Sequence, residues 1–260
     1  MCGRYASARK REDLLEEFRI DRDQVSADLE PDYNVAPTKP VYAVLTRPGR
    51  EPGEGGGGPE AGPGAEDVAR ELRVVRWGLV PFWAKDPSIG SRMINARVET
   101  VDAKPAFRRA FAKRRCLLPA DGFYEWLKVQ DQGKARKQPY YIHRADNGVL
   151  AFAGLYELWR DKSAPEDDPH AWLWTSVIIT TRAEDEVGHI HERMPMVIDP
   201  ARWDDWLDPV NTEASHLHAL LAPASASGLA TYPVGTDVNY VKNNGPALIK
   251  PLAGEPAPLV

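Results

Sequence analysis

Short stretches in which hydrophobic and polar residues alternate recur along the chain, and this pattern is typical of strands. Strands are predicted at 41–45, 72–75, 116–118, 123–129, 140–143, 150–158 and 172–180. Gly133 and Asn147-Gly148 are expected to supply turns between them, and Asn-Gly is a strong signal for a hairpin. Because strands outnumber helices, the pattern predicts an α+β fold, in which helices flank a curved, barrel-like antiparallel or mixed sheet.

Helices are expected in a few short segments, and residues 33–37 are expected to form a turn. Residues 10–19 would place Leu14, Leu15 and Phe18 on one face of a helix. Three further helices are predicted from their start signals: one capped by Asp102, one starting at Asp199-Pro200, and one capped by Thr212 and ending at Leu221.

Residues 48–65 are rich in Gly, Pro and Glu and include four consecutive glycines. Such a composition cannot form a packed core and is typical of a flexible surface loop. We interpret it as an insertion between two strands, because the segment before it is too short to fold alone. We therefore expect a single domain over residues 1–251, followed by a disordered tail at 252–260.

The composition indicates a cytoplasmic protein without a membrane-spanning segment. The net charge is −5 and the hydrophobic fraction is 43%, and the N-terminus lacks the apolar stretch of a signal peptide. The sequence contains no run of about 18 apolar residues, so no membrane-spanning helix is expected. Cys2 and Cys116 are the only cysteines, so no disulfide framework is implied, and a reducing cytoplasmic compartment is expected.

An acidic protein can still bind nucleic acid through a local basic patch. Residues 104–115 contain six Lys or Arg side chains and no acidic residue. The usual interpretation of such a run is a solvated helix face. Tryptophans 77, 83 and 126 could stack on bases, although tryptophan is more often a core residue.

Cys2 would become the N-terminal residue if Met1 were removed. It would then carry an α-amine and a thiol on adjacent carbons, with ordinary pKa values of about 8 and about 8.5. An aldehyde can form a Schiff base with that amine, and the thiol can then close a five-membered thiazolidine. An internal cysteine cannot do this because its nitrogen is an amide. The alternative is that Cys2 is an ordinary residue at a frayed terminus.

Polar residues at three further places are candidates for chemistry. Glu125 lies among aromatic residues, where partial desolvation would raise its pKa and suit proton transfer, whereas strand alternation favours a solvent-facing position. His191 could act as a general acid or base, or bind metal with His189, but no further ligand has the spacing of a zinc site. Asn95 and Arg97 would face the same side of an extended segment and could bind an amine and a phosphate.

Several motifs in this order together resemble the SRAP family, the SOS response-associated peptidase-like proteins that act on abasic sites in DNA. The resemblance extends from Cys2 to about Pro251. The motifs are Met1-Cys2-Gly3-Arg4-Tyr5, Tyr33-Asn34-Val35-Ala36-Pro37, Trp77-Gly78-Leu79-Val80-Pro81, Ile94-Asn95-Ala96-Arg97-Val98-Glu99-Thr100, Asp121-Gly122-Phe123-Tyr124-Glu125-Trp126, Thr180-Thr181, His191-Glu192-Arg193-Met194-Pro195 and Val241-Lys242-Asn243.

The resemblance implies a single α+β domain with a curved, barrel-like sheet. It also implies a positively charged channel for single-stranded DNA, and capture of the ring-opened abasic aldehyde as a reversible thiazolidine. The implied catalytic residues are Cys2, Asn95, Glu125 and His191, and the implied DNA contacts are Arg4, Pro37, Trp83, Arg97, Trp126, Thr180 and Arg193. No cofactor and no metal are implied. Pro105 stands where the family often has a basic residue, and Lys104 or Arg108 could replace that contact.

Two other classes of function remain open at this point. A free N-terminal cysteine is also the nucleophile of N-terminal-nucleophile amidohydrolases, and the peptidase name of the family would fit self-removal of Met1. A noncovalent module for single-stranded DNA is the other alternative. The expectation is a cytoplasmic, nucleoid-associated monomer in the DNA damage response, without a membrane partner, that crosslinks to abasic sites in single-stranded DNA.

Overall fold

The computed structural model describes residues 2–48, 68–131, 134–221 and 228–252. Gly133 and nearly all of the expected insertion and tail lie outside these residues. Within them, no helix is long and apolar enough to cross a membrane.

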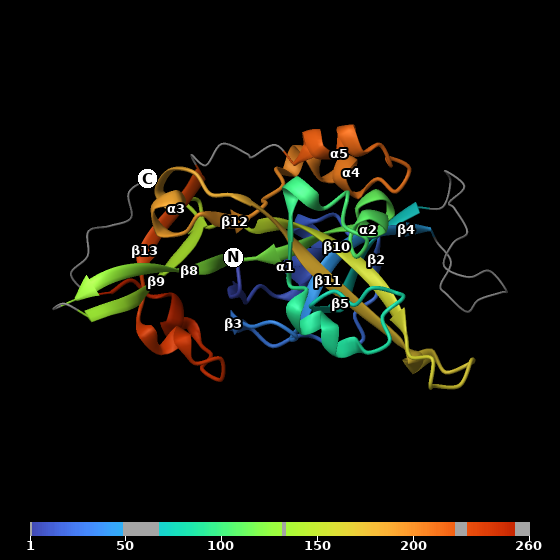
Figure 1. Ribbon diagram of the computed structural model, residues 1–260, viewed down its shortest axis with the longest axis horizontal. Helices are drawn as coiled ribbons and strands as arrows, with labels where there is room; N and C mark the ends of the chain where they lie inside the picture. Colours follow the sequence, from blue (N-terminus) through green and yellow to red (C-terminus); the bar gives the residue numbers. More distant parts are fainter. Residues whose placement is uncertain (1, 49–67, 132–133, 222–227, 253–260) are drawn as a thin grey trace.

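Strands and short helices make up the described parts of the chain, which confirms the expected α+β class (Figure 1). The strands are β1 (Tyr5–Ser7), β2 (Arg22–Asp23), β3 (Asp32–Val35), β4 (Pro40–Pro48), β5 (Val68–Trp77), β6 (Asn95–Arg97), β7 (Arg115–Ala120), β8 (Gly122–Asp131), β9 (Lys134–Arg144), β10 (Leu150–Arg160), β11 (Trp172–Arg182), β12 (Arg193–Pro195) and β13 (Leu229–Pro233). The α-helices are α1 (Arg11–Glu17), α2 (Arg108–Lys113), α3 (Asp185–Ile190), α4 (Trp203–Leu207) and α5 (Ala214–Leu220). The 3-10 turns include η1 (Pro87–Arg92), η2 (Val98–Thr100) and η4 (Pro200–Arg202).

Strands β4, β5, β7, β10 and β11 close on one another as a mixed barrel. Neighbours in the order β11-β10-β7-β4-β5 are antiparallel, and a parallel pairing of β5 with β11 closes the ring, with Thr175 opposite Arg76. All residues of β10 except the last are buried. This burial explains why its sequence is a nearly continuous hydrophobic run instead of an alternating one.

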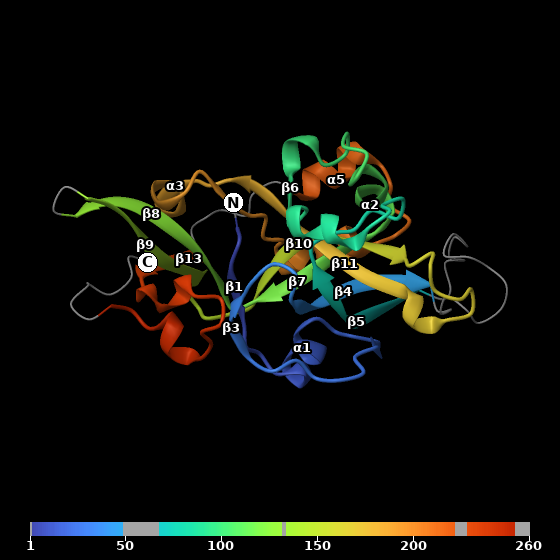
Figure 2. The same cartoon turned by 60° about the horizontal axis from the view of Figure 1, so that its bottom comes forward.

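A second sheet with the order β13-β9-β8-β1-β3 lies beside the barrel. Figure 2 shows β8 and β9 extending away from the barrel, with α1 and α5 on opposite sides of it. The N-terminal residues pack into the space between the sheets: Cys2 and Tyr5 belong to one hydrophobic cluster with Trp77 and Phe152 of the barrel. The Tyr5 ring lies 5.2 Å from that of Trp77 and 5.8 Å from that of Phe152.

The turn at Asn147-Gly148 forms, but it does not make the expected hairpin. Asn147 has φ 58°, a left-handed conformation that Asn tolerates better than most residues. However, β9 pairs with β8 and β13, whereas β10 pairs with β7 and β11. The turn therefore carries the chain from one sheet to the other, because both edges of β9 and of β10 are paired with other strands.

The predicted turn at 33–37 and two predicted helix N-caps also differ from the structure. Residues 33–35 lie in β3 instead of a turn, because they pair with β1. Helix α2 begins at Arg108, after a Phe107 N-cap, so Asp102 does not cap it. The residue at the N-cap of α5 is Glu213, not Thr212. The Asp199 signal is correct, since its side chain accepts a hydrogen bond from the Ala201 amide.

The basic run at 104–115 is not uniformly a solvated face. Arg108 and Lys113 are exposed, but Arg115 is buried and donates hydrogen bonds to main-chain carbonyls that include those of Phe111 and Trp206. The Arg114 guanidinium bonds to the buried carboxylate of Glu157. The last two arginines of the run therefore hold α2 and α4 against the barrel, and are not available to a ligand.

Candidate active site

The four residues implied as catalytic meet where the two sheets join. The Asn95 side-chain amide donates a 2.8 Å hydrogen bond to the Cys2 carbonyl oxygen. The His191 Nε2 atom lies 4.0 Å from the Glu125 Oε2 atom. The pKa of the Cys2 thiol is raised mainly by burial and also by the negative charge of the nearby Glu125 carboxylate. Residues 2, 95, 125 and 191 thus form one cluster.

Strand pairing explains this convergence. Strand β1 runs antiparallel to β8, with Tyr5 opposite Phe123, which brings the preceding Cys2 toward Glu125. Strand β6 runs parallel to β11, with Asn95 opposite Ile178. His191 follows α3 and precedes β12, which pairs with the end of the same β11.

Cys2 is fully buried, and its thiol is a neutral S–H at pH 7. Burial raises its pKa well above the ordinary value, and the nearby Glu125 carboxylate raises it further. The second cysteine, Cys116, is also buried, but it lies in β7 of the barrel, in contact range of Gly154. Cys2 is therefore the thiol at the site, and it is not activated as a thiolate.

Glu125 is 2% exposed, so strand alternation predicted its environment wrongly. Burial raises the pKa of its carboxyl to about 7. A group with such a pKa is about half protonated at pH 7 and can both donate and accept a proton there. Its neighbours Phe123 and Tyr124 are also fully buried, and they belong to two different hydrophobic clusters, so both faces of β8 are covered.

The orientation of the His191 ring is fixed by the backbone. The His191 Nδ1 atom lies within hydrogen-bond distance of both the Arg193 amide (3.0 Å) and the Arg193 carbonyl oxygen (3.2 Å), which turns Nε2 toward Glu125. Partial burial lowers the pKa of His191, which keeps the ring neutral at pH 7.

A metal role for His189 and His191 is not supported by the geometry. Residues 185–190 form α3, so the two histidines are not on an extended chain. Among the described residues, no group of three or more His, Cys, Asp or Glu side chains could hold a metal ion.

The implied DNA contacts fall into two groups. Trp83 is 49% exposed, Arg97 is exposed and Pro37 is partly exposed. Arg4 is partly buried: it donates to the Asn34 side-chain oxygen at 2.7 Å, and its guanidinium lies 5.9 Å from the Trp126 ring. These five remain predicted contacts.

Thr180 and Arg193 are different, because both are buried. The Arg193 guanidinium bonds to the Glu99 carboxylate and donates a 2.6 Å hydrogen bond to the Thr180 carbonyl oxygen. In this arrangement neither side chain is presented at the surface. Arg193 is thus paired with Glu99, and the expected contacts of Thr180 and Arg193 with DNA stay predictions.

Two residues near the site were missed by reasoning from the sequence. Asn34 is fully buried and its amide donates to the carbonyl oxygens of Tyr240 and Asn243, so it ties the C-terminal segment to β3. Glu99 lies within the motif at 94–100, but no function was predicted for it. Their presence in motifs was the only signal, because both act through partners distant in sequence.

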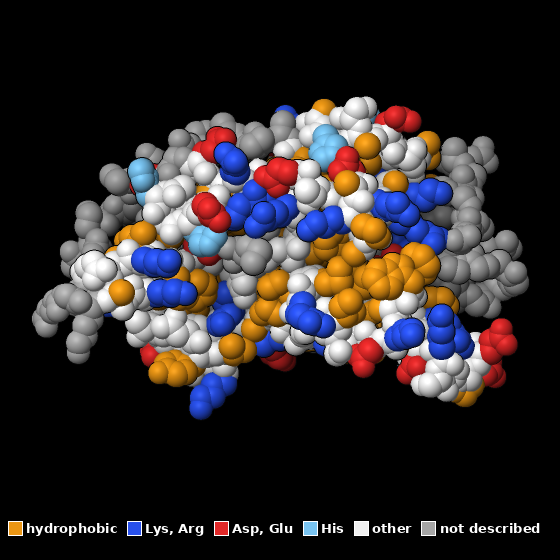
Figure 3. Space-filling model, viewed as in Figure 1, with side chains coloured by type: hydrophobic (Ala, Val, Ile, Leu, Met, Phe, Trp, Pro, Cys, Tyr) orange, Lys and Arg blue, Asp and Glu red, His pale blue; other side chains and the backbone are white. Residues whose placement is uncertain are grey.

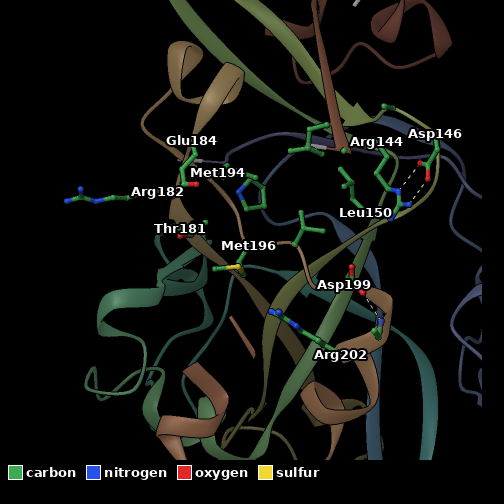
Figure 4. Close-up of a pocket in the computed structure, with 16 residues that line it drawn as sticks. Arg144, Asp146, Leu150, Thr181, Arg182, Glu184, Met194, Met196, Asp199 and Arg202 are labelled. Atoms are coloured by element: carbon green, nitrogen blue, oxygen red, sulfur yellow. Dashed lines mark hydrogen bonds and ion pairs between the residues drawn. The ribbon is translucent and has the colours of Figure 1, made fainter. Parts of the chain in front are cut away.

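The surface around the site carries cations and apolar side chains. Figure 3 shows Lys and Arg side chains spread across the face on which the chain begins, and hydrophobic side chains gathered in its right half. A cavity of about 680 Å³ lies elsewhere, where β9, β10, β12 and β13 come together (Figure 4). None of the four clustered residues lines it.

Known proteins are similar to this chain in sequence and in architecture. The family model of the SOS response associated peptidase (SRAP) matches residues 1–241. The abasic site processing protein YoqW of Bacillus subtilis is 37% identical over 250 residues, covering 96% of this chain and 99% of its own. The abasic site processing protein YedK of Escherichia coli is 31% identical over 258 residues, covering 97% and 100%. A crystal structure of a protein from Bacteroides thetaiotaomicron superposes with a TM-score of 0.75 at 25% identity, covering 96% and 100%. With a family model over nearly its whole length and relatives above 30% identity, this chain belongs to the SRAP family.

Proposed function

We propose that this protein processes abasic sites in single-stranded DNA by a reversible covalent crosslink through Cys2, once Met1 has been removed. The relatives named as abasic site processing proteins support the substrate class. The observation that carries the chemistry is the cluster of Cys2, Asn95, Glu125 and His191 at the junction of the two sheets.

The amine attacks first, because the buried thiol is protonated at pH 7. The Cys2 nitrogen adds to the aldehyde carbon C1′ of the opened abasic sugar and gives a carbinolamine. Loss of water then gives an imine. Sγ adds to the imine carbon, its proton moves to the nitrogen, and a thiazolidine results. The balance is one aldehyde plus one aminothiol giving one thiazolidine and one water, without any oxidant or reductant.

Glu125 is the group for these proton transfers. With a pKa of about 7, it can remove a proton from the attacking amine and return it to the departing hydroxyl. The same carboxyl can take the Sγ proton during ring closure and give it back when the ring opens. Reversal therefore needs no additional catalytic residue.

His191 serves the preceding step. An abasic sugar is mostly a closed hemiacetal, and opening it requires proton transfer at the ring oxygen and the hydroxyl. The His191 ring is neutral, and its Nε2 atom is directed to the same space as the Glu125 carboxyl. Asn95 holds the Cys2 carbonyl and thereby fixes the nucleophile against β6.

The hydrolase alternative is less well supported. A cysteine nucleophile of that class attacks as a thiolate. Burial and the Glu125 charge keep the Cys2 thiol protonated, which is the opposite of activation. Purely noncovalent binding requires no proton transfer, so it would not explain a buried Glu125 with a pKa of about 7.

The test is the intact mass of the protein after incubation with abasic single-stranded DNA. The mature chain should gain the mass of the strand minus one water, and undamaged DNA should add nothing. A matched chain that keeps an N-terminal extension retains the thiol but has no free Cys2 amine. A covalent adduct of that extended chain at the yield of the mature chain would refute the mechanism.

A further inference from the structure

The Val241-Lys242-Asn243 motif has no part in the chemistry above. It follows the 3-10 turn η6 (Thr236–Asn239), in the segment after β13. This segment, red in Figures 1 and 2, packs against β9 and β3. The Asn243 amide donates a 2.9 Å hydrogen bond to the Tyr240 carbonyl oxygen, so the chain makes a tight turn with Val241 and Lys242 at its centre.

The turn is held by a buried side chain from a distant part of the chain. Asn34 of β3 is fully buried, and its side-chain amide donates 3.0 Å hydrogen bonds to the carbonyl oxygens of Tyr240 and Asn243, the two ends of the turn. The Asn243 side-chain amide donates a further bond of 2.9 Å to the Asp237 carbonyl oxygen. These bonds fix the backbone from which the exposed side chains of the turn project.

The same turn lies beside the candidate active site. Arg4 follows Cys2 by two residues, so their Cα atoms are at most about 7 Å apart. Arg4 donates a 2.7 Å hydrogen bond to the Val238 carbonyl oxygen, and the Trp126 ring nitrogen donates one of 2.7 Å to the Asn239 side-chain oxygen. Arg4 and Trp126 are both predicted DNA contacts, so a strand that touches them passes the turn.

The turn exposes an aromatic ring next to a cation. Tyr240 is 63% exposed, more than any other aromatic side chain of the described residues, and Lys242 is exposed as well. Surfaces that bind single-stranded DNA combine aromatic rings, on which bases stack, with cations that neutralise phosphates. A lone exposed apolar side chain needs no explanation. Here, however, the backbone is held by a buried side chain, and two predicted DNA contacts adjoin it.

We propose that the turn at 240–243 is a further DNA-binding surface, in which the Tyr240 ring stacks on a base and Lys242 neutralises a phosphate. This inference rests on the proposed function, because it takes single-stranded DNA as the ligand. Every base has a face that can stack on a ring, so this contact tolerates any sequence beside the abasic site.

The experiment measures noncovalent binding of the full chain to two strands of equal length. One is undamaged oligothymidylate, and the other consists only of tetrahydrofuran units, which carry neither a base nor an aldehyde. Loss of one stack between a base and an aromatic ring weakens binding by about 5- to 150-fold. Tyr240→Ala should show such a loss with oligothymidylate, at an unchanged salt dependence, and should bind the base-free strand as wild type does.

Three results would overturn the stacking role. They are binding of oligothymidylate by Tyr240→Ala at the wild-type affinity, an equal loss on both strands, and a loss in Tyr240→Phe as large as in Tyr240→Ala. Tyr240→Phe keeps the ring and should bind both strands as wild type does. Val210→Ala is the matched control, because Val210 is 66% exposed and lies between α4 and α5. It should change neither affinity, and a loss equal to that of Tyr240→Ala would contradict a specific role for the ring.

Lys242→Gln tests the phosphate contact. It should flatten the slope of log K against log salt by roughly 0.7 with either strand. Lys162→Gln, in the exposed turn after β10, is the control and should leave the slope unchanged. An unchanged slope in Lys242→Gln would overturn the assignment of a phosphate to this turn.

The adduct with abasic DNA is measured separately. Its absence would refute the proposed function and leave both binding comparisons valid, whereas failed binding comparisons would leave the crosslink untouched.

Discussion

Glu125→Gln should stabilise the protein at neutral and alkaline pH while it impairs the reaction. The folded state raises the pKa of Glu125 from its ordinary 4.5 to about 7, chiefly by burial. At 1.36 kcal/mol per pH unit, ionising this carboxyl in the folded state costs about 3 kcal/mol. The side chain is 3% exposed, so little of this is screened by solvent. Gln has nearly the same shape and carries no charge at any pH.

The sign follows from proton linkage. Because the folded state holds the proton more tightly, the contribution of Glu125 to stability is complete below pH 4.5 and is lost as pH rises through about 7. Wild type and Glu125→Gln should therefore differ little at pH 4.5. The variant should then gain up to about 3 kcal/mol by pH 8, or roughly 5–10 °C in Tm for a domain of this size.

Thermal unfolding of both proteins between pH 4.5 and 8.5 measures this difference. Glu16→Gln, which removes an exposed carboxylate from α1, is the control and should follow the wild-type profile. A stability difference that does not change with pH would refute a buried carboxyl with a raised pKa. The same variant should slow both crosslinking and release by about 10²–10⁴, the usual contribution of a general acid or base.

Three further predictions concern the other residues of the site. Cys2→Ala should abolish the stable adduct and keep noncovalent binding of DNA; a stable adduct at wild-type yield, measured by intact mass, would contradict the assigned nucleophile. Arg97→Ala should flatten the salt dependence of DNA binding by about 0.7 in slope, and an unchanged slope would exclude Arg97 as a phosphate ligand. His191→Ala should slow capture of a ring-closed abasic site more than capture of a substrate that is already an open aldehyde, and equal slowing in a time course of both would rule out a role in ring opening.

Local pattern gave the fold class and most of the strands, because alternation and hydrophobic runs depend on burial. The long run 150–158 became β10, which is buried on both faces. Local pattern failed at Asn147-Gly148, where the turn forms but the strands on either side join different sheets. No signal at the turn specifies that the chain changes sheet there, because the change depends on the pairing of β9 with β8 and β13 and of β10 with β7 and β11.

The site was predictable from motifs and only weakly from single residues. Alternation alone placed Glu125 in solvent, whereas it is buried, because both faces of β8 are covered. The grouping of Asn95 with Cys2 depends on a parallel pairing of β6 with β11, which no spacing reveals. Arg193 was assigned to DNA by the resemblance to the SRAP family, and its ion pair with Glu99, 94 residues away, could not be seen from the sequence.

The carbon that forms the crosslink provides the most direct test of the central claim. An abasic strand labelled with ¹³C at C1′ can be mixed with the mature protein and followed by NMR without any reductant. The account predicts that the hemiacetal signal is replaced by that of a saturated carbon bonded to nitrogen and sulfur, and that this signal is absent with Cys2→Ala. Persistence of the hemiacetal signal, or a final imine signal with no saturated product, would contradict capture as a thiazolidine by Cys2.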